Sequence, residues 1–224
     1  MRLKLDVNIK VNRIIKHMVV SDLLFTGSWS FIQPIFAIFV VKDIAGATII
    51  TAGMVAGLYW LVKSFIQLPV ANFLDRDESE RDDFYALVGA ISLAAISAFS
   101  FVLVDKIWEL LMVQVMYALA MGVYIPAWNG LFSHHLDSKR YSFDWSLDST
   151  AIGFTAFITS LSGGILAELF GFRFVFFLVG VFSLAGAMVL YLAPTIFFPG
   201  LKGTSKSSME VPPAEHPAEG PATH

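Results

Sequence analysis

Three ionisable side chains lie inside or beside long apolar stretches of this chain, where an unpaired charge is expensive. Asp22 and Asp148 are carboxylates close to the starts of two such stretches, and Lys63 lies in the middle of another. A carboxylate in such surroundings can carry a proton or bind a cation, and an ammonium attracts an anion or a carboxylate partner. Ionisable residues at membrane depth usually face a partner or a water-filled path.

Uncharged polar residues extend these positions into stripes. Residues that recur every three or four positions share one face of a helix. Such stripes occupy four apolar stretches: Asp22, Thr26, Trp29 or Ser30, and Gln33; Tyr59, Lys63 and Gln67; Gln114, Tyr117, Tyr124 and Trp128; Asp148, Thr155, Thr159 and Ser162. The third and sixth stretches carry only scattered Ser and Gly. We therefore expect the first, second, fourth and fifth stretches to line something polar and the third and sixth to be peripheral.

The elements that must position these stripes are membrane-spanning helices. Of the 224 residues, 56% are hydrophobic and 15% are charged, against about 25% charged in soluble domains. Because a bilayer core needs about 20 apolar residues per helix, we predict six spans, at residues 18–41, 48–74, 84–104, 108–132, 147–170 and 173–198. The fold class is thus an all-α membrane protein with six transmembrane helices.

The distribution of basic residues predicts the orientation. Most Lys and Arg residues lie in the N-terminal segment, the second and fourth connections and the C-terminal tail, which the positive-inside rule places in the cytoplasm. We expect a basic cytoplasmic N-terminus at 1–17, a six-helix domain at 18–198 and a disordered cytoplasmic tail at 199–224, which is rich in Pro, Ser, Ala and Glu. Both termini would be cytoplasmic, in a plasma or inner membrane.

Several function classes find no support in the sequence. The chain has no cysteine, which excludes disulfides, thiolate metal sites and cysteine nucleophiles. It has no nucleotide-binding loop, and His17, His134 and His135 lie only at the edges of spans, so neither ATP hydrolysis nor intramembrane proteolysis is expected. A channel would be expected to carry a ring of like charges, and the sequence shows none. We expect no enzymatic activity, cofactor, metal or nucleic-acid partner; a scaffold without transport activity remains an alternative.

Three motifs resemble the N-terminal six-helix half of a major facilitator superfamily transporter. Residues 71–76 read Ala-Asn-Phe-Leu-Asp-Arg, similar to that family's Gly-x-Leu-Ala-Asp-Arg loop signature after the second helix. Residues 124–129, Tyr-Ile-Pro-Ala-Trp-Asn, resemble the proline-bearing end of its fourth helix. Residues 163–176 resemble its connection between the fifth and sixth helices, with a Gly pair followed by Ala-Glu, Gly, Arg and Val-Phe. The likeness covers about residues 18–198.

The sequence also departs from the family pattern. Ala71 replaces the usual first Gly of the loop signature, and an acidic segment at 77–83 replaces most of its basic end, of which only Arg81 remains. Ala118 occupies a place where many proton-coupled exporters of the family carry Arg. Thr159 and Ser160 stand in place of the Gly-Pro of the antiporters' fifth helix. These departures leave the coupling mechanism open.

The resemblance implies two three-helix repeats and transport of an unknown small solute by alternating access. Asp75 and Arg76, with Arg81, would form a cytoplasmic gate. Asp22 and Asp148 are the candidate proton or ion carriers, and Asp22 is also a candidate partner for Lys63. The predicted cavity contacts are Trp29, Gln33, Lys63, Gln67, Tyr124 and Asn129.

The resemblance covers half of the twelve spans that are usual in the family. A homodimer, a separately encoded second six-helix half, or truncation of a twelve-helix transporter would each account for this. The predicted partners are therefore the lipid bilayer, the solute and a second half.

Overall fold

The computed structural model describes residues 13–76, 80–136 and 140–193. Within these ranges, six helical segments are long and apolar enough to cross a membrane. The first, Arg13–Asp43, contains α1 (Arg13–Trp29), the short 3-10 helix η1 (Gln33–Ile35) and α2 (Phe36–Asp43). The others are α3 (Ile49–Leu74), α4 (Glu80–Phe101), α5 (Ile107–His134), α6 (Tyr141–Phe170) and α7 (Phe172–Tyr191). The prediction of six membrane helices is confirmed.

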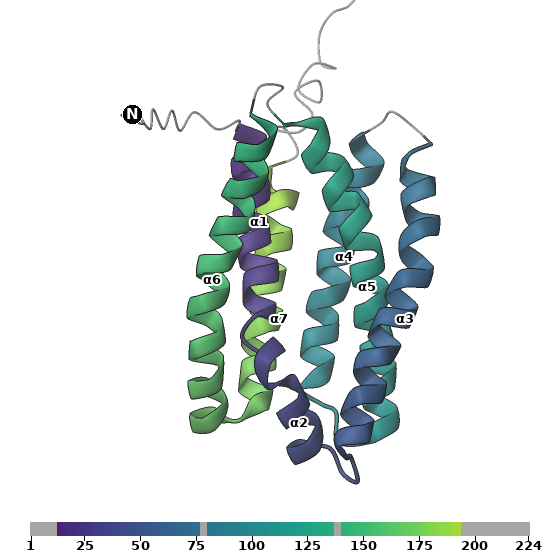
Figure 1. Cartoon of the computed structure of the whole chain (residues 1–224), viewed down its shortest axis with the longest axis vertical. Helices are drawn as coiled ribbons and strands as arrows, with labels where there is room; N and C mark the ends of the chain where they lie inside the picture. Colours follow the sequence, from purple (N-terminus) through teal and green to yellow (C-terminus); the bar gives the residue numbers. More distant parts are fainter. Residues whose placement is uncertain (1–12, 77–79, 137–139, 194–224) are drawn as a thin grey trace, which may run out of the picture.

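The helices stand side by side in one bundle (Figure 1). α1 begins and α7 ends at the same end of it, which we call the Arg13 end; the opposite end, with the connection between α4 and α5, is the Asp105 end. The fifth predicted span corresponds to α6, which begins at Tyr141, earlier than predicted. The predicted sixth span reaches beyond the described residues.

The packing of the helices follows two repeated three-helix units. α1 packs on α7 and α6, while α5 packs on α4 and α3. If α1, α3 and α4 of the first unit are matched with α5, α6 and α7 of the second, each of these contacts has a counterpart, and all of them, like α4–α7, run between the two units. This arrangement agrees with the predicted three-helix repeats.

The prediction that the third and sixth spans are peripheral is wrong for the bundle itself. α4 and α7 are among its most buried helices, whereas α3 and α6 have few fully buried residues and expose many large apolar side chains. Small residues explain the burial, because they let helix backbones approach closely. Ala90, Ala94 and Ala98 are buried on α4, and a methyl group added at Gly180 of α7 would meet the Phe99 ring at 2.6 Å.

The first span is interrupted, although it was predicted as one continuous stretch. Pro34 has no N–H and its ring would clash with the carbonyl group four residues earlier, which is that of Ser30. α1 accordingly ends at Trp29, and turns lead into η1. The freed Ser30 carbonyl oxygen accepts a hydrogen bond from the Ser160 hydroxyl of α6 at 3.0 Å. The neighbouring helix thus satisfies the backbone group that proline leaves unpaired.

A glycine on α6 lets the broken segment come close. A methyl group added at Gly163 would overlap the carbonyl oxygen of Phe31, which lies inside the break. At the adjacent Gly164 an added methyl group would meet no atom within 4 Å. Gly163 therefore fixes how closely the break approaches α6.

Connections at the Asp105 end are tied together. The Ala45 N–H donates to the Asp105 carbonyl oxygen at 3.0 Å, and the Glu109 carboxylate accepts from the backbone N–H groups of Asp105 and Lys106 at the start of α5. The Arg173 guanidinium forms an ion pair with the Asp105 carboxylate. These bonds link the connections after α2 and α4 to the start of α7.

Candidate solute cavity and buried carboxylate pair

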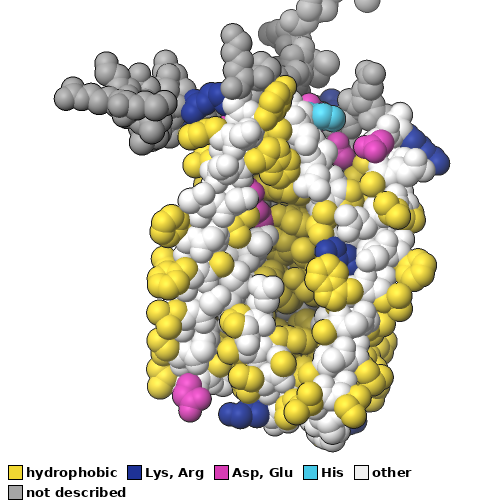
Figure 2. All heavy atoms as spheres, viewed as in Figure 1, with side chains coloured by type: hydrophobic (Ala, Val, Ile, Leu, Met, Phe, Trp, Pro, Cys, Tyr) yellow, Lys and Arg dark blue, Asp and Glu magenta, His cyan; other side chains and the backbone are white. Residues whose placement is uncertain are grey.

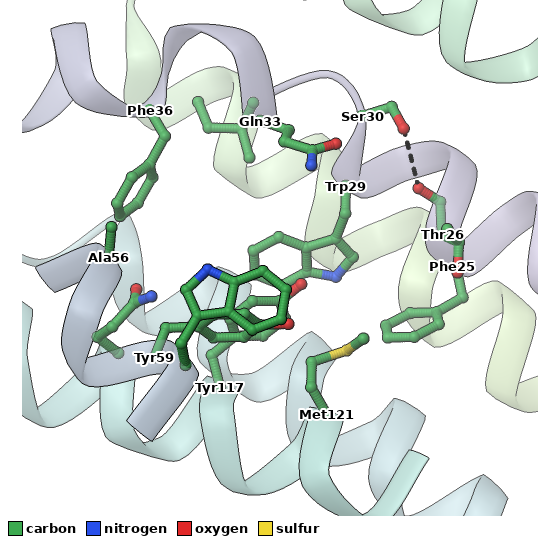
Figure 3. Close-up of a pocket in the computed structure, with 13 residues that line it drawn as sticks. Phe25, Thr26, Trp29, Ser30, Gln33, Phe36, Ala56, Tyr59, Tyr117 and Met121 are labelled. Atoms are coloured by element: carbon green, nitrogen blue, oxygen red, sulfur yellow. Dashed lines mark hydrogen bonds between the residues drawn. The ribbon is translucent and has the colours of Figure 1, made fainter. Parts of the chain in front are cut away.

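One face of the bundle is hollowed, with acidic and basic side chains visible on its walls (Figure 2). Part of this space is a cavity of about 360 Å³ whose described lining comes from the first span, α3 and α5. None of the lining side chains carries a formal charge, and nearly half are aromatic. They are Phe25, Thr26, Trp29, Ser30, Ile32, Gln33, Phe36, Ala56, Tyr59, Trp60, Gln114, Tyr117 and Met121 (Figure 3).

Three aromatic rings of the lining are stacked. The Trp29 and Tyr117 rings lie 3.8 Å apart between centroids at an interplanar angle of 21°, and Tyr59 stacks on Tyr117 at 5.5 Å and 19° (Figure 3). Trp60 meets Tyr59 edge to face at 5.3 Å. Stacked and edge-on pairs are the favoured arrangements of aromatic side chains. The stack joins α1, α5 and α3 across the cavity.

Two glutamines supply amide groups to the same cavity. Gln33 lies in η1, where the Pro34 break places it, and Gln114 lies on α5. Neither amide forms a hydrogen bond to another described side chain or backbone group, and the Nε1 atom of Trp29 is buried without a described partner. The cavity therefore offers hydrogen-bonding groups that the described chain does not use.

A buried carboxylate lies on the same face of α1, closer to the Arg13 end. Asp22 is 3% exposed, and its Oδ1 atom accepts hydrogen bonds from the hydroxyl groups of Thr26, at 2.5 Å, and of Tyr124 on α5. This pair of donors explains how a carboxylate can be held in an apolar bundle. It also joins the predicted stripes of the first and fourth spans.

Asp148 of α6 is the second buried carboxylate. It is 4% exposed, lies within electrostatic range of Asp22, and its Oδ1 atom is buried without a hydrogen-bond partner among the described residues. Both carboxylates lie nearly two helical turns from the nearer end of their helices. A buried polar atom without a partner is rare and calls for a ligand, water or a proton.

The predicted pairing of Asp22 with Lys63 is wrong. The Lys63 ammonium makes no ion pair with a described residue and lies instead over the Trp60 ring, at 4.4 Å from its centroid, and 5.7 Å from that of Tyr59. Asp22 is turned toward α5, where Tyr124 binds it. Cation–π attraction stabilises the half-buried lysine in place of a carboxylate.

The predicted cavity contacts divide into two groups. Trp29 and Gln33 line the cavity, whereas Lys63, Gln67, Tyr124 and Asn129 do not. Lys63 and Gln67 are half-buried on α3, Tyr124 is buried against Asp22, and Asn129 is exposed near the end of α5.

The fifth span contributes no described lining residue to this cavity. Its hydroxyl groups bond carbonyl oxygens of their own helix: Thr155 donates to Ala151 at 3.0 Å and Thr159 to Thr155 at 2.9 Å. Such self-bonding is common for Ser and Thr in membrane helices. Of the residues in this stripe, Asp148 is the one that lies within electrostatic range of Asp22.

The proposed gate residues lie at the Arg13 end. Asp75 caps the end of α3, and the side chains of Asp75, Arg76 and Arg81 are exposed there. Nearby, Glu80 at the start of α4 lies 3.8 Å from His134 and 3.5 Å from His135 at the end of α5. Within the described ranges, no three His, Asp or Glu residues form a group that could hold a metal ion.

Sequence reasoning missed the apolar part of the lining. Phe25, Phe36, Ala56, Trp60 and Met121 contact the cavity, but each lies outside the polar stripes. In an apolar helix, the residue type does not distinguish an apolar side chain that faces a cavity from one that faces lipid. Each of these five residues nevertheless lies within four residues of a predicted stripe position. Periodicity around Trp29, Tyr59 and Tyr117 was the available signal.

Comparison with known proteins identifies the family pattern over most of the chain. The family described as Major Facilitator Superfamily matches residues 18–220. The chain is 26% identical over 85 residues to the proton-coupled antiporter flippase LtaA of Staphylococcus saprophyticus subsp. saprophyticus, which is 38% of this chain and 21% of that protein.

A solved structure supports the same fold. The crystal structure of the POT family transporter PepTSo superposes with a TM-score of 0.72 and 16% identity, covering 93% of this chain and 40% of that one. At this identity the likeness shows the fold alone. The chain thus spans about a fifth of the curated relative and two fifths of the solved structure that it matches.

Proposed function

The chain belongs to the Major Facilitator Superfamily, and we propose that it supplies one six-helix half of a transporter that moves a small solute by alternating access. Membership of a transporter family agrees with the expectation of a non-enzymatic, multi-pass membrane protein. The observation that carries the proposal is the hollow face, which holds a cavity and two buried carboxylates, Asp22 of α1 and Asp148 of α6. A bundle that served only as a scaffold would have no need of buried, incompletely bonded carboxylates, which are costly.

Asp22 and Asp148 are the proposed coupling site. Two carboxylates close together in an apolar bundle repel each other when both are ionised, so binding of a proton or cation to the pair is favoured. Asp22 already has two hydroxyl donors, whereas Asp148 lacks a described partner for Oδ1. Asp148 is therefore the better candidate for the group that binds and releases the ion. The curated relative's description as a proton-coupled antiporter is consistent with a proton in this role.

A second six-helix unit is proposed to cover the hollow face. Lys63 and the unbonded amides would otherwise face lipid tails, where polar groups find no partner. The flanking helices α3 and α6 expose large apolar side chains, among them Phe65 and Phe157, which such a unit would bury. Two copies of the chain would insert in the same orientation, because identical sequences have the same distribution of Lys and Arg.

The Arg13 end is proposed to face the cytoplasm, following the distribution of Lys and Arg. Asp75, Arg76 and Arg81 would then gate the cytoplasmic side. Lys63, Gln67, Tyr124 and Asn129 would join the path in a conformation other than the present one, since they lie outside the cavity described above.

Disulfide cross-linking tests the second unit directly, because the chain has no native cysteine. Cysteines at Phe65 of α3 and Phe157 of α6 are introduced together and tested in native membranes, because a two-fold axis through the hollow face would bring α3 of one copy against α6 of the other. The control chain carries cysteines at Tyr85, which is exposed on α4, and at Phe157. Cross-linked dimers with the first pair and none with the control pair would support a homodimer closed over the hollow face. Equal cross-linking with both pairs would indicate random collision, and none with the first pair would reject a second copy there.

A further inference from the structure

The chemical character of the cavity indicates the class of solute, an inference that rests on the function proposed above. None of the described lining residues is ionisable near neutral pH. The Lys63 ammonium lies over the Trp60 ring, and the Asp22 carboxylate is bonded by Thr26 and Tyr124, so both charges lie behind the lining and are held by neutral groups. Because no described lining side chain is itself charged, a charged solute would lose water without a direct ion pair in the cavity, which is unfavourable.

The stacked rings indicate a solute with a flat or ring-shaped face. Trp29, Tyr117 and Tyr59 form a near-parallel series in the cavity wall, with interplanar angles of 21° and 19°. Such a series presents ring faces or edges to anything that occupies the cavity, and further rings stack on these at little cost in side-chain entropy. A volume of about 360 Å³ suits a small molecule and lies at the lower end of the range for ligand pockets.

The unused hydrogen-bonding groups indicate that the ring carries polar substituents. The amides of Gln33 and Gln114 and the hydroxyl groups of Tyr59 and Tyr117 make no hydrogen bond to a described residue. Trp29 is 9% exposed, and its side-chain N–H is buried without a described partner. The amides both donate and accept. Buried polar groups are normally satisfied, so a ligand rich in hydroxyl or amide groups would complete the site.

We propose that this cavity binds an uncharged, ring-shaped solute that carries several hydrogen-bonding groups, stacked on Trp29 or Tyr59 at an end of the ring series and hydrogen-bonded to Gln33, Gln114 and the Tyr117 hydroxyl group. Two kinds of molecule share this chemistry. A pyranose offers a C–H face and hydroxyl groups, and a neutral heterocycle offers a planar face and amide-like edges.

Binding to matched solutes tests the proposal. The full chain is placed in lipid nanodiscs, because alkyl-glycoside detergents carry sugar rings of their own. Glucose is compared with its anionic and cationic analogues glucuronate and glucosamine, and uracil with its anionic analogue orotate, by calorimetry and by tryptophan fluorescence. Glucose or uracil is expected to bind at least about tenfold more tightly than its charged analogues, and which of the two binds identifies the kind of ring.

Single hydroxyl deletions locate the site. Tyr117→Phe is expected to weaken binding by roughly two- to tenfold through loss of one hydrogen bond, whereas Tyr85→Phe on the exposed face of α4 leaves it unchanged. Tighter binding of glucuronate, glucosamine or orotate, absence of binding by all five solutes, or equal effects of the two variants would overturn the proposal. If none of these solutes binds as expected but the cavity is accessible from both sides of the membrane, the solute class is wrong and the transporter function stands. If glucose or uracil binds but the cavity is not accessible from both sides, the solute class stands and the transporter function is wrong.

Discussion

Replacement of two neighbouring glycines on α6 by alanine gives a sharp test of how the broken first span is packed. An alanine methyl group at position 163 would overlap the carbonyl oxygen of Phe31, while at position 164 it would meet no atom within 4 Å. The overlapped atom belongs to the backbone, so it cannot rotate away as a side chain would. Relief requires α6 to move away from the break.

The two substitutions are expected to change the free energy of unfolding in different directions. Both substitutions gain about 0.8–1 kcal/mol of helix propensity. Overpacking costs about 1–3 kcal/mol, and the fixed backbone contact at Gly163 favours the upper part of that range. Gly163→Ala should therefore lower the free energy of unfolding by about 1–2 kcal/mol, whereas Gly164→Ala should leave it unchanged or raise it by up to about 1 kcal/mol.

The assay is equilibrium unfolding by SDS in mixed micelles, followed by tryptophan fluorescence. Trp29 and Trp128 are buried and report the loss of packing. The difference between the two variants matters more than either value alone, because both carry the same chemical change. Equal unfolding free energies for Gly163→Ala and Gly164→Ala would refute the close approach of α6 to the break.

Three further substitutions test individual polar contacts. Ser160→Ala leaves the Ser30 carbonyl oxygen without its donor and should destabilise the bundle by about 0.6–1.7 kcal/mol in the same unfolding assay; no change would show that water replaces the hydroxyl group. Tyr124→Phe removes one of two donors to the Asp22 carboxylate and should cost about 1–3 kcal/mol, which a neutral result would contradict. Asp148→Asn removes a buried charge whose Oδ1 has no described partner, so it should stabilise the bundle while abolishing ion-coupled transport in proteoliposomes. Loss of both stability and transport would show instead that Asp148 has a structural role.

The fold was predictable because the bilayer imposes a simple pattern. Long apolar stretches separated by charged connections locate helices whatever their tertiary contacts, and the structure has helices at all six predicted places. The burial of α4 and α7 was not predictable from their low polarity. Small residues such as Gly180 and Ala94 serve equally on lipid-facing and helix-facing surfaces, and only the partner distinguishes the two.

The site was predictable in part for a related reason. Polar residues stand out in an apolar helix, so Trp29, Gln33, Asp22 and Asp148 could be selected from spacing alone. The contacts between polar groups of different helices could not be predicted, because they depend on how each helix is rotated about its axis. Tyr124 was predicted as a solute contact, and in this structure its hydroxyl group holds the Asp22 carboxylate.

The break at Pro34 illustrates the same limit. The proline is visible in the sequence, but the Ser160 hydroxyl that satisfies the freed carbonyl group lies 130 residues away. Local chemistry therefore predicts that a helix will be interrupted, and tertiary structure decides what the interruption contacts.

Access of water to the cavity from each side of the membrane tests the transporter account most directly. Gln114 is replaced by cysteine at the cavity wall, and Ile96 by cysteine on the exposed apolar face of α4. Both are treated with a membrane-impermeant maleimide in right-side-out and inside-out vesicles. Alternating access predicts that the cysteine at position 114 reacts from both sides, to an extent that changes with the pH gradient, while the cysteine at position 96 reacts from neither. Reaction at position 114 from one side only under every gradient, or from neither side, would contradict the account.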